Sequence, residues 1–295
     1  MIIAFLLLMA VSPSDVKAQG QKSKSKFQKE KNEDDKIVRW DFGINFGATF
    51  ANGYTANFYN GSQGNLNTIS YIMTNKYWYQ EIKLLLQASD TVILREMPTN
   101  MHYNTALSGG LYFRYNFTPR WSLFFEANYA RLKTDGIFTV QVDPASYLTT
   151  PDIRLFGVHG TEQRVNFDIG GHCKFPVYRK KMNLFLDAGL NVNYVRVLKN
   201  FINFNEKEYS IINIYGNQYY VPNTNLQEYQ NIEGGLGYGL YAGGGTGFTF
   251  TPQLGLELGG YVDYISVDLE GYKQFKPSAG IYIRFLLSNI INGDD

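Results

Sequence analysis

Hydrophobic and polar residues alternate one by one in eight segments of the chain. In the first segment, Trp40, Phe42, Ile44 and Phe46 alternate with polar residues and glycines. Because successive side chains of a β-strand point to opposite faces, this pattern predicts a strand with one apolar and one polar face. The predicted strands comprise residues 39–50, 104–117, 121–129, 164–175, 183–194, 236–250, 254–264 and 275–285.

Charge is confined to one face of these predicted strands. The apolar faces carry no charged residue, although Lys, Arg, Asp and Glu make up 18% of the chain. The charged residues of the polar faces are Arg39, Asp41, Arg114, Glu126, Arg164, Asp168, Lys174, Asp187, Glu257, Asp263 and Arg284. The alternative to a membrane barrel is a soluble sandwich or barrel. Such a fold would bury the apolar face and leave the charged face in water.

The connections between the strands alternate between long and short. Long segments at about 51–102, 132–163 and 198–234 are separated by short turns, of which Phe117-Thr118-Pro119-Arg120 is one. An even number of strands of about ten residues, with long loops on one side only, is typical of outer-membrane barrels. The sequence therefore predicts an all-β fold, a closed eight-stranded antiparallel transmembrane up-and-down β-barrel over residues 37–287 with three long extracellular loops.

Aromatic residues gather where the predicted strands meet the short turns. They are Trp40, Phe117, Trp121, Phe175, Phe250 and Phe285. A second set, Phe50, Tyr103, Tyr129, Tyr194 and Tyr264, marks the opposite strand ends. Two aromatic girdles at the membrane interfaces are expected of such barrels. With an even strand number, Trp40 and Phe285 fall at the same rim, which predicts an outer-membrane protein with both termini in the periplasm and the long loops outside.

An eight-stranded barrel has an interior just wide enough to be filled by side chains. Unpaired charges in so narrow a space would be costly. We therefore expect the inward charges to pair with one another and to plug the barrel, which argues against a diffusion pore. Glycines of the sixth strand, such as Gly239 and Gly243, leave room for large inward rings.

The ends of the chain differ from its middle. Residues 1–18 hold an apolar run of ten residues followed by small residues, which predicts a signal peptide. Residues 19–36 mix lysines with acidic residues and predict a charged, solvated periplasmic tail. Residues 288–295 are expected to form a short periplasmic extension.

Composition excludes several kinds of chemistry. A formal net charge of +1 argues against a nucleic-acid partner, and the single Cys173 excludes an internal disulfide and a Cys-rich zinc site. His102, His159 and His172 do not have a metalloprotease spacing, so we expect no metal, no cofactor and no enzymatic activity. His172 is expected to be a hydrogen-bonded lumen residue. A lipid-modifying enzyme would need an acid beside His102 or His159, for which the candidates are Asp143, Asp152 and Glu162.

The long loops are the places where recognition could occur. Residues 77–86 have the pattern of a short amphipathic helix, and the third loop could contain an extra hairpin. Exposed aromatic and aliphatic residues at this density mark an interface, or they pack the loops against one another; both interpretations stay open. The candidate partner-binding residues are Tyr77, Trp78, Tyr79, Tyr209, Ile212, Tyr215, Tyr219 and Tyr220.

The strand pattern, the export signal and the last strand, residues 278–285, resemble the small outer-membrane β-barrel proteins of the OmpA/OmpX-like class. The Tyr- and Asn-rich loops are similar to those of the PorT-like barrels of Bacteroidota. The chain departs from the class by continuing past Phe285 instead of ending on an aromatic residue. The resemblance covers residues 37–287 and implies an accessory subunit of secretion, surface-lipoprotein or barrel-assembly machinery. Its partners would be outer-membrane lipids, other outer-membrane proteins or surface lipoproteins. The alternative is a free-standing surface binding protein or adhesin.

Overall fold

The computed structural model describes residues 40–62, 68–143, 151–178, 181–211 and 233–288. The predicted signal peptide, the charged tail, Arg39 and most of the predicted C-terminal extension lie outside these residues. No helix within the described ranges has the length and hydropathy needed to cross a membrane.

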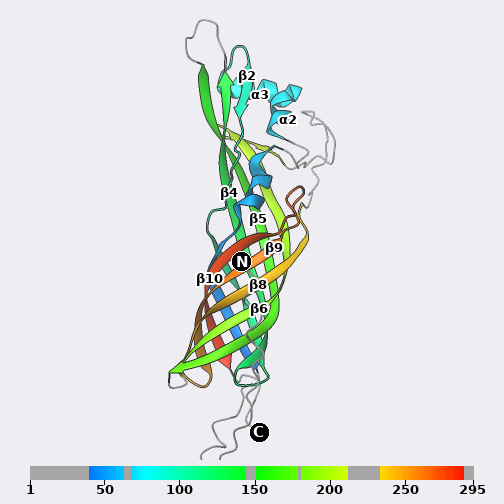
Figure 1. Cartoon of the computed structure of the whole chain (residues 1–295). Coiled ribbons are helices and arrows are strands. Elements are labelled where there is room, and N and C mark those ends of the chain that lie inside the picture. Colours follow the sequence, from blue (N-terminus) through cyan, green and yellow to red (C-terminus); the bar gives the residue numbers. More distant parts are fainter. Residues whose placement is uncertain (1–39, 63–67, 144–150, 179–180, 212–232, 289–295) are drawn as a thin grey trace, which may run out of the picture. The chain divides into compact units, whose positions relative to one another are not determined.

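Eight strands close into a ring in which each strand pairs antiparallel with two neighbours. They are β1 Trp40–Phe50, β3 Ala106–Asn116, β4 Trp121–Val142, β5 Asp152–Tyr178, β6 Met182–Phe204, β8 Leu236–Thr249, β9 Leu254–Ser266 and β10 Lys276–Ser288. The ring closes where β1 pairs with β10, with Phe42 opposite Leu287, while its other edge pairs with β3. The predicted fold, a closed eight-stranded antiparallel barrel, is confirmed (Figure 1).

The outer wall of the barrel is apolar, as the alternation predicts. Outward side chains such as Phe46, Leu190 and Ile281 are each more than half exposed. The wall ends on one side at the short turns and on the other at a row in which Tyr129 of β4 and Tyr194 of β6 flank Val165 of β5. We call this zone the apolar band. From Trp121 to Tyr129 it measures nine residues along β4, close to the length of a tilted transmembrane strand.

Three neighbouring strands continue beyond the apolar band. In this extension β4 continues to its end at Val142, β5 begins at Asp152, and β6 continues to its end at Phe204. The three strands remain paired there (Figure 1). Most of the predicted second loop, residues 132–163, is therefore strand: the hairpin pairs from Lys133 opposite Thr161 up to Val142 opposite Asp152. The prediction of an extra hairpin in the third loop is confirmed by β7, Lys207–Ser210, which pairs with the end of β6.

The apolar face of these strands changes sides at the edge of the band. Within the band the outward residues are apolar, whereas beyond it Leu132, Phe138 and Val140 of β4 point inward and are buried. Other parts of the chain cover the inner side of the strands at this level. Because the apolar residues change from the outer to the inner face, the sequence pattern ends the predicted strand at residue 129, whereas β4 continues to Val142.

The inner side of the extension is covered by the first long connection. It contains α1 Gly53–Ala56, the 3-10 helix η1 Asn57–Asn60, α2 Ile69–Thr74, α3 Lys76–Leu86 and β2 Val92–Glu96. α3 is the predicted amphipathic helix; Asn75 caps its start by accepting from the backbone N–H groups of Tyr77 and Trp78. These elements and the extension share one hydrophobic core, and together we call them the cap.

Candidate functional site

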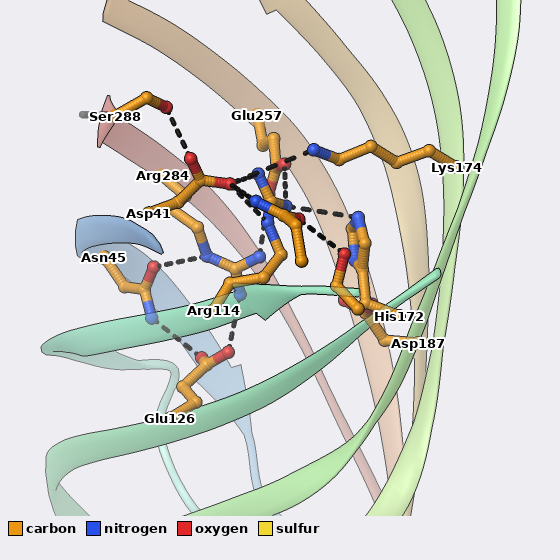
Figure 2. Close-up of polar contacts among 12 residues, drawn as sticks. Asp41, Asn45, Arg114, Glu126, His172, Lys174, Asp187, Glu257, Arg284 and Ser288 are labelled. Atoms are coloured by element: carbon orange, nitrogen blue, oxygen red, sulfur yellow. Dashed lines mark hydrogen bonds and ion pairs between the residues drawn. The ribbon is translucent and has the colours of Figure 1, made fainter. Parts of the chain in front are cut away.

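The lumen within the apolar band holds a network of buried charges from seven strands (Figure 2). Its centre is Glu257 of β9, which accepts from Arg114 Nη1 at 2.7 Å and from Arg284 Nη1 at 2.8 Å. Arg114 also reaches Asp41 at 2.6 Å, and Arg284 reaches Glu126 at 2.5 Å. All five side chains are at most 4% exposed, so each guanidinium binds two carboxylates away from bulk water.

Neutral residues complete the network. Asn45 of β1 donates from Nδ2 to Glu126 at 2.8 Å and accepts from Arg284 Nε at 2.8 Å. His172 lies between Arg114 Nη1, 3.1 Å from its Nε2, and Asp187 Oδ1, 2.5 Å from its Nδ1. A guanidinium can only donate, so Nε2 accepts and Nδ1–H donates to Asp187. His172 is thus the hydrogen-bonded lumen residue that the sequence predicts.

Aromatic rings fill the rest of this level. Tyr112, Phe124 and Tyr241 form a buried cluster against which Tyr261 packs. The guanidinium carbon of Arg284 lies 3.5 Å from the centroid of the Tyr112 ring and 4.5 Å from that of Tyr282. Charges and rings together occupy the interior at this level, as expected for an eight-stranded barrel.

The predicted lumen charges do not all join one network. Lys174 is joined to it at the short-turn end, 3.9 Å from Asp41, and is partly exposed. Arg164 lies at the opposite end and pairs with Glu162 at 2.5 Å. Asp168 accepts from Asn191 Nδ2 at 2.7 Å. Among the described residues, neither Asp168 nor Asp263 forms an ion pair, so the interior carries more carboxyl groups than basic ones.

A second buried cluster joins the barrel to the cap. Glu162 of β5 accepts from Arg164 and, through Oε2, from the hydroxyls of Tyr59 at 2.6 Å and Tyr103 at 3.0 Å. Burial and the Glu162 carboxylate raise the pKa of Tyr59 well above its ordinary value, which keeps this hydroxyl protonated as a donor. Tyr103, which the sequence places in an aromatic girdle, instead packs against the core of the cap.

Five of the six predicted girdle residues lie at the short-turn end. Trp40, Phe117, Trp121, Phe175 and Phe250 are 41–62% exposed on the outside of the barrel. Phe285 is also half exposed, but it pairs with Ile44, four residues along β1 from Trp40. Phe285 therefore lies within the apolar band instead of level with Trp40.

The candidate partner-binding residues are mostly internal. Trp78 and Tyr209 are 6% and 3% exposed, and their ring centroids are 6.3 Å apart in the core of the cap. The hydroxyl of Tyr79 accepts from the backbone N–H of Val92 at 3.0 Å. Tyr77 is 42% exposed. Of the two interpretations of these loops, internal packing holds for Trp78, Tyr79 and Tyr209. The other candidates, Ile212, Tyr215, Tyr219 and Tyr220, lie outside the described residues.

The acids nominated for an enzyme have other roles. Asp143 accepts from the backbone N–H groups of Ser89 and Asp90, each at 2.6 Å, and ties the start of β2 to the end of β4. Asp152 pairs with Arg154 at 2.8 Å, and Glu162 belongs to the cluster at the foot of the cap.

The histidines outside the barrel show no catalytic arrangement. His159 pairs with Asp135 at 2.6 Å. Within the described ranges, no hydroxyl or thiol hydrogen-bonds to the imidazole of His102 or His159, and no group of three His, Cys, Asp or Glu side chains is placed to bind a metal.

Comparison with known proteins gives matches at the level of fold. No family model and no curated protein matches the chain. Among solved structures, it is similar to Neisserial surface protein A, with 10% identity, 86% of this chain and 98% of that one covered, and a TM-score of 0.40. The outer membrane protein OprG from Pseudomonas aeruginosa is 10% identical; the match covers 85% of this chain and 94% of OprG, with a TM-score of 0.38. Ail, the attachment invasion locus protein of Yersinia pestis, is 9% identical; the match covers 85% of this chain and 99% of Ail, with a TM-score of 0.34.

Proposed function

We propose that this chain is an integral outer-membrane β-barrel without enzymatic activity that serves as an accessory subunit of an outer-membrane protein complex. Lipid surrounds the apolar band, and a second membrane-anchored protein contacts the cap. The observation that carries the proposal is a bare aliphatic surface on the outer face of the cap, formed by Ile93, Ile137, Ile153 and Leu155. We call this surface the aliphatic patch.

The closed lumen supports a role other than conduction. Glu126, Glu257 and Arg284 fix one another in the middle of the barrel, and each is at most 2% exposed. Moving a solute through this level would separate buried ion pairs, at a cost of several kcal/mol for each partner left alone. The barrel then serves as an anchor, and interactions with other proteins fall to the cap.

The aliphatic patch is exposed on both sides of a polar pair, Gln141 and the guanidinium of Arg95 that donates to it. Its residues are 40–66% exposed and come from three adjacent strands, with Ile93 of β2 opposite Gln141 of β4, and Gln141 opposite Ile153 of β5. Exposed aliphatic side chains grouped on one face mark an interaction site in soluble parts of proteins. The opposite face of the same strands is covered by the core of the cap, so the patch is the uncovered side of an otherwise packed sheet.

The position of the patch favours a partner in the same membrane. β4 and β5 run without interruption from the apolar band into the patch, and the outward residues of both regions lie on one face of one sheet. A protein beside the barrel could contact the lipid-facing wall and the patch together. In this proposal the cap lies outside the cell, and the barrel ends at Asp41 and Ser288, which pair with each other, lie on the periplasmic side.

A free-standing surface binder is the second candidate. The observation that favours it is that the cap has its own hydrophobic core, in which Ile72, Trp78, Ile82 and Phe204 are buried. Such a core can hold a binding surface in place with no second subunit. The likeness to PorT-like barrels and a place in secretion, surface-lipoprotein or barrel-assembly machinery belong to the first candidate and remain predictions.

Gentle detergent extraction of the tagged chain from its own membranes, followed by native gel electrophoresis and mass spectrometry, tests the proposal. We expect a stoichiometric complex with another envelope protein, and we expect Leu155→Asp to remove the partner. Leu84→Asp is the matched control, because Leu84 is 80% exposed on α3, outside the patch. A chain that migrates alone would overturn the accessory-subunit proposal in favour of the surface binder.

A further inference from the structure

Two rows of basic side chains lie on the outer face of the barrel directly beyond the apolar band. The last row of the band is aromatic at both flanks, with Tyr129 and Tyr194 on either side of Val165. Two residues further along, Arg131 of β4 lies opposite Gln163 of β5, which lies opposite Arg196 of β6.

The next row repeats this order of a basic, a neutral polar and a basic residue. Lys133 lies opposite Thr161, which lies opposite Lys199. Lys133 and Lys199 are exposed, and Thr161 is partly exposed. We call the four cations, Arg131, Lys133, Arg196 and Lys199, the basic grid.

A β-bulge keeps the second row on the outer face. Glu162 pairs with Val197 but Thr161 pairs with Lys199, so β6 contains one extra residue, Leu198, at this point. The extra residue reverses which positions face outward. As a result Lys199 is exposed and its neighbour Asn200 is buried, whereas regular alternation from Tyr194 would have placed Lys199 inside.

The dimensions of the grid suit a phosphate group. Neighbouring strands are about 4.8 Å apart, so the two cations of a row are separated by about 10 Å, and the rows by about 7 Å along the strands. Long basic side chains can converge across this distance on an anion placed over Thr161 and Gln163. Both central side chains can donate a hydrogen bond to it.

The described part of the chain offsets the charge of the grid only in part, through the electrostatic interaction of Lys133 with Asp135. None of its four cations forms an ion pair with a described carboxylate. The following row contains one acid, Asp135, whose carboxylate is held by His159 at 2.6 Å and by Asn104 Nδ2 at 2.9 Å. Lys199 Nζ lies 5.8 Å from the ring centroid of Phe201. On the other side of the barrel, Lys273 pairs with Asp268 at 2.5 Å, and Lys276 lies 4.7 Å from the ring centroid of Tyr54.

We infer that the basic grid binds the phosphate groups of anionic lipids in the leaflet that adjoins the cap. An aromatic row marks the interface of a membrane barrel, so the residues just beyond it lie among lipid headgroups. Basic residues beside a membrane are attracted to an anionic surface over about one Debye length. A phosphorylated lipid at this site would lie against β4, β5 and β6 only, because the grid is confined to these strands.

The test is a titration of the full-length chain, purified in a neutral detergent, with diphosphoryl lipid A, read by native mass spectrometry. We expect saturable binding, and about 25-fold weaker binding for the double variant Arg131→Gln/Arg196→Gln. This estimate takes a loss of about fivefold for each basic residue removed near an anionic surface. Arg131→Lys/Arg196→Lys keeps the charge and should stay within a few-fold of the unmodified chain.

Lys76→Gln/Lys83→Gln is the matched control, because it removes two charges from α3 in the cap and should leave binding unchanged. Equal binding by the Arg131→Gln/Arg196→Gln variant and the unmodified chain would overturn the assignment. Full displacement of lipid A by millimolar inorganic phosphate would overturn it in favour of a soluble phosphate site. Both results are independent of the proposed protein complex, whose test uses the aliphatic patch.

Discussion

The guanidinium of Arg284 lies over the ring of Tyr112 inside the barrel, with 3.5 Å between its central carbon and the ring centroid. The two residues come from β10 and β3, on either side of β1, and both are completely buried. The ring face therefore stabilises a cation whose three nitrogen atoms each donate to another partner, Asn45, Glu257 or Glu126. Stacking and ion pairing act on the same guanidinium from different directions.

Replacement of Tyr112 separates the contribution of its ring from that of its hydroxyl. Tyr112→Leu removes the ring face under Arg284 and leaves a cavity, so we expect a loss of about 2–3 kcal/mol in the free energy of unfolding. Tyr112→Phe keeps the ring, and the Tyr112 hydroxyl has no hydrogen-bond partner among the described residues. We expect Tyr112→Phe to change stability by less than about 1 kcal/mol. Thermal unfolding in detergent, followed by circular dichroism, measures both variants; equal losses would contradict a role for the ring.

Two acids on β9 should respond in opposite ways to removal of their charge. Glu257 binds both Arg114 and Arg284, so Glu257→Gln leaves two buried cations short of a partner and should cost about 3–5 kcal/mol. Asp263 is also buried but has no ion pair among the described residues, and its Oδ1 has no hydrogen-bond partner there. Asp263→Asn should be neutral or stabilise the barrel by about 1 kcal/mol. Denaturant unfolding of the two variants side by side checks this, and a large loss for Asp263→Asn would show that its charge is compensated.

The structure should lose stability as the pH rises towards neutrality because of Glu233, whose backbone carbonyl accepts from Val197 N–H of β6. Burial, together with the carboxylate of Glu270, raises the pKa of Glu233 to about 7. In the unfolded chain the same group titrates near pH 4.3. The folded state thus disfavours the ionised form: its stability is full below about pH 4.3, falls as the pH rises to about 7, and stays reduced above that value.

Glu233→Gln should abolish this pH dependence. Because the side chain is partly exposed, we expect a gain of only about 1–2 kcal/mol at pH 8 and none at pH 4. Glu270→Gln, which removes the second cause, should give a smaller gain in the same direction. Unfolding measured at several pH values for the three chains provides the comparison. The same pH profile for Glu233→Gln and the unmodified chain would refute the explanation.

The barrel itself could be predicted from the sequence because lipid imposes one rule along every strand. Each outward side chain in the band must be apolar, so residues such as Leu186, Leu190 and Val192 of β6 repeat with period two. Inward positions can be charged only if their partners lie on other strands. The sequence shows which residues face inward, but register and stagger decide that Arg114 meets Glu257 and that Asp263 forms no ion pair with a described residue.

The cap was less predictable because the rule changes at the edge of the band. There the outward positions of β4 become Arg131, Lys133 and Asp135, and the apolar residues move to the inward positions. Apolar and polar residues still alternate, but the apolar residues now occupy the inward positions. In the sequence this change looks like the start of a loop. The sequence pattern puts Glu162 in that loop and Arg164 in a strand, so the pattern does not reveal that the two residues pair.

Gly160 should determine how closely the cap is held to the barrel. A Cβ atom at this position of β5 would lie 2.3 Å from the ring of Tyr59, whose hydroxyl donates to Glu162. Gly160→Val should displace the ring, break that hydrogen bond and expose part of the cap core, at a cost of about 2–3 kcal/mol. Gly171→Ala in the same strand is the control, since a Cβ atom there meets no atom within 4 Å. Hydrogen exchange of the backbone amides in η1 and α2 should rise in Gly160→Val and not in Gly171→Ala. Unchanged protection in Gly160→Val would mean that the cap is held by its own core and not by the contact between Tyr59 and β5.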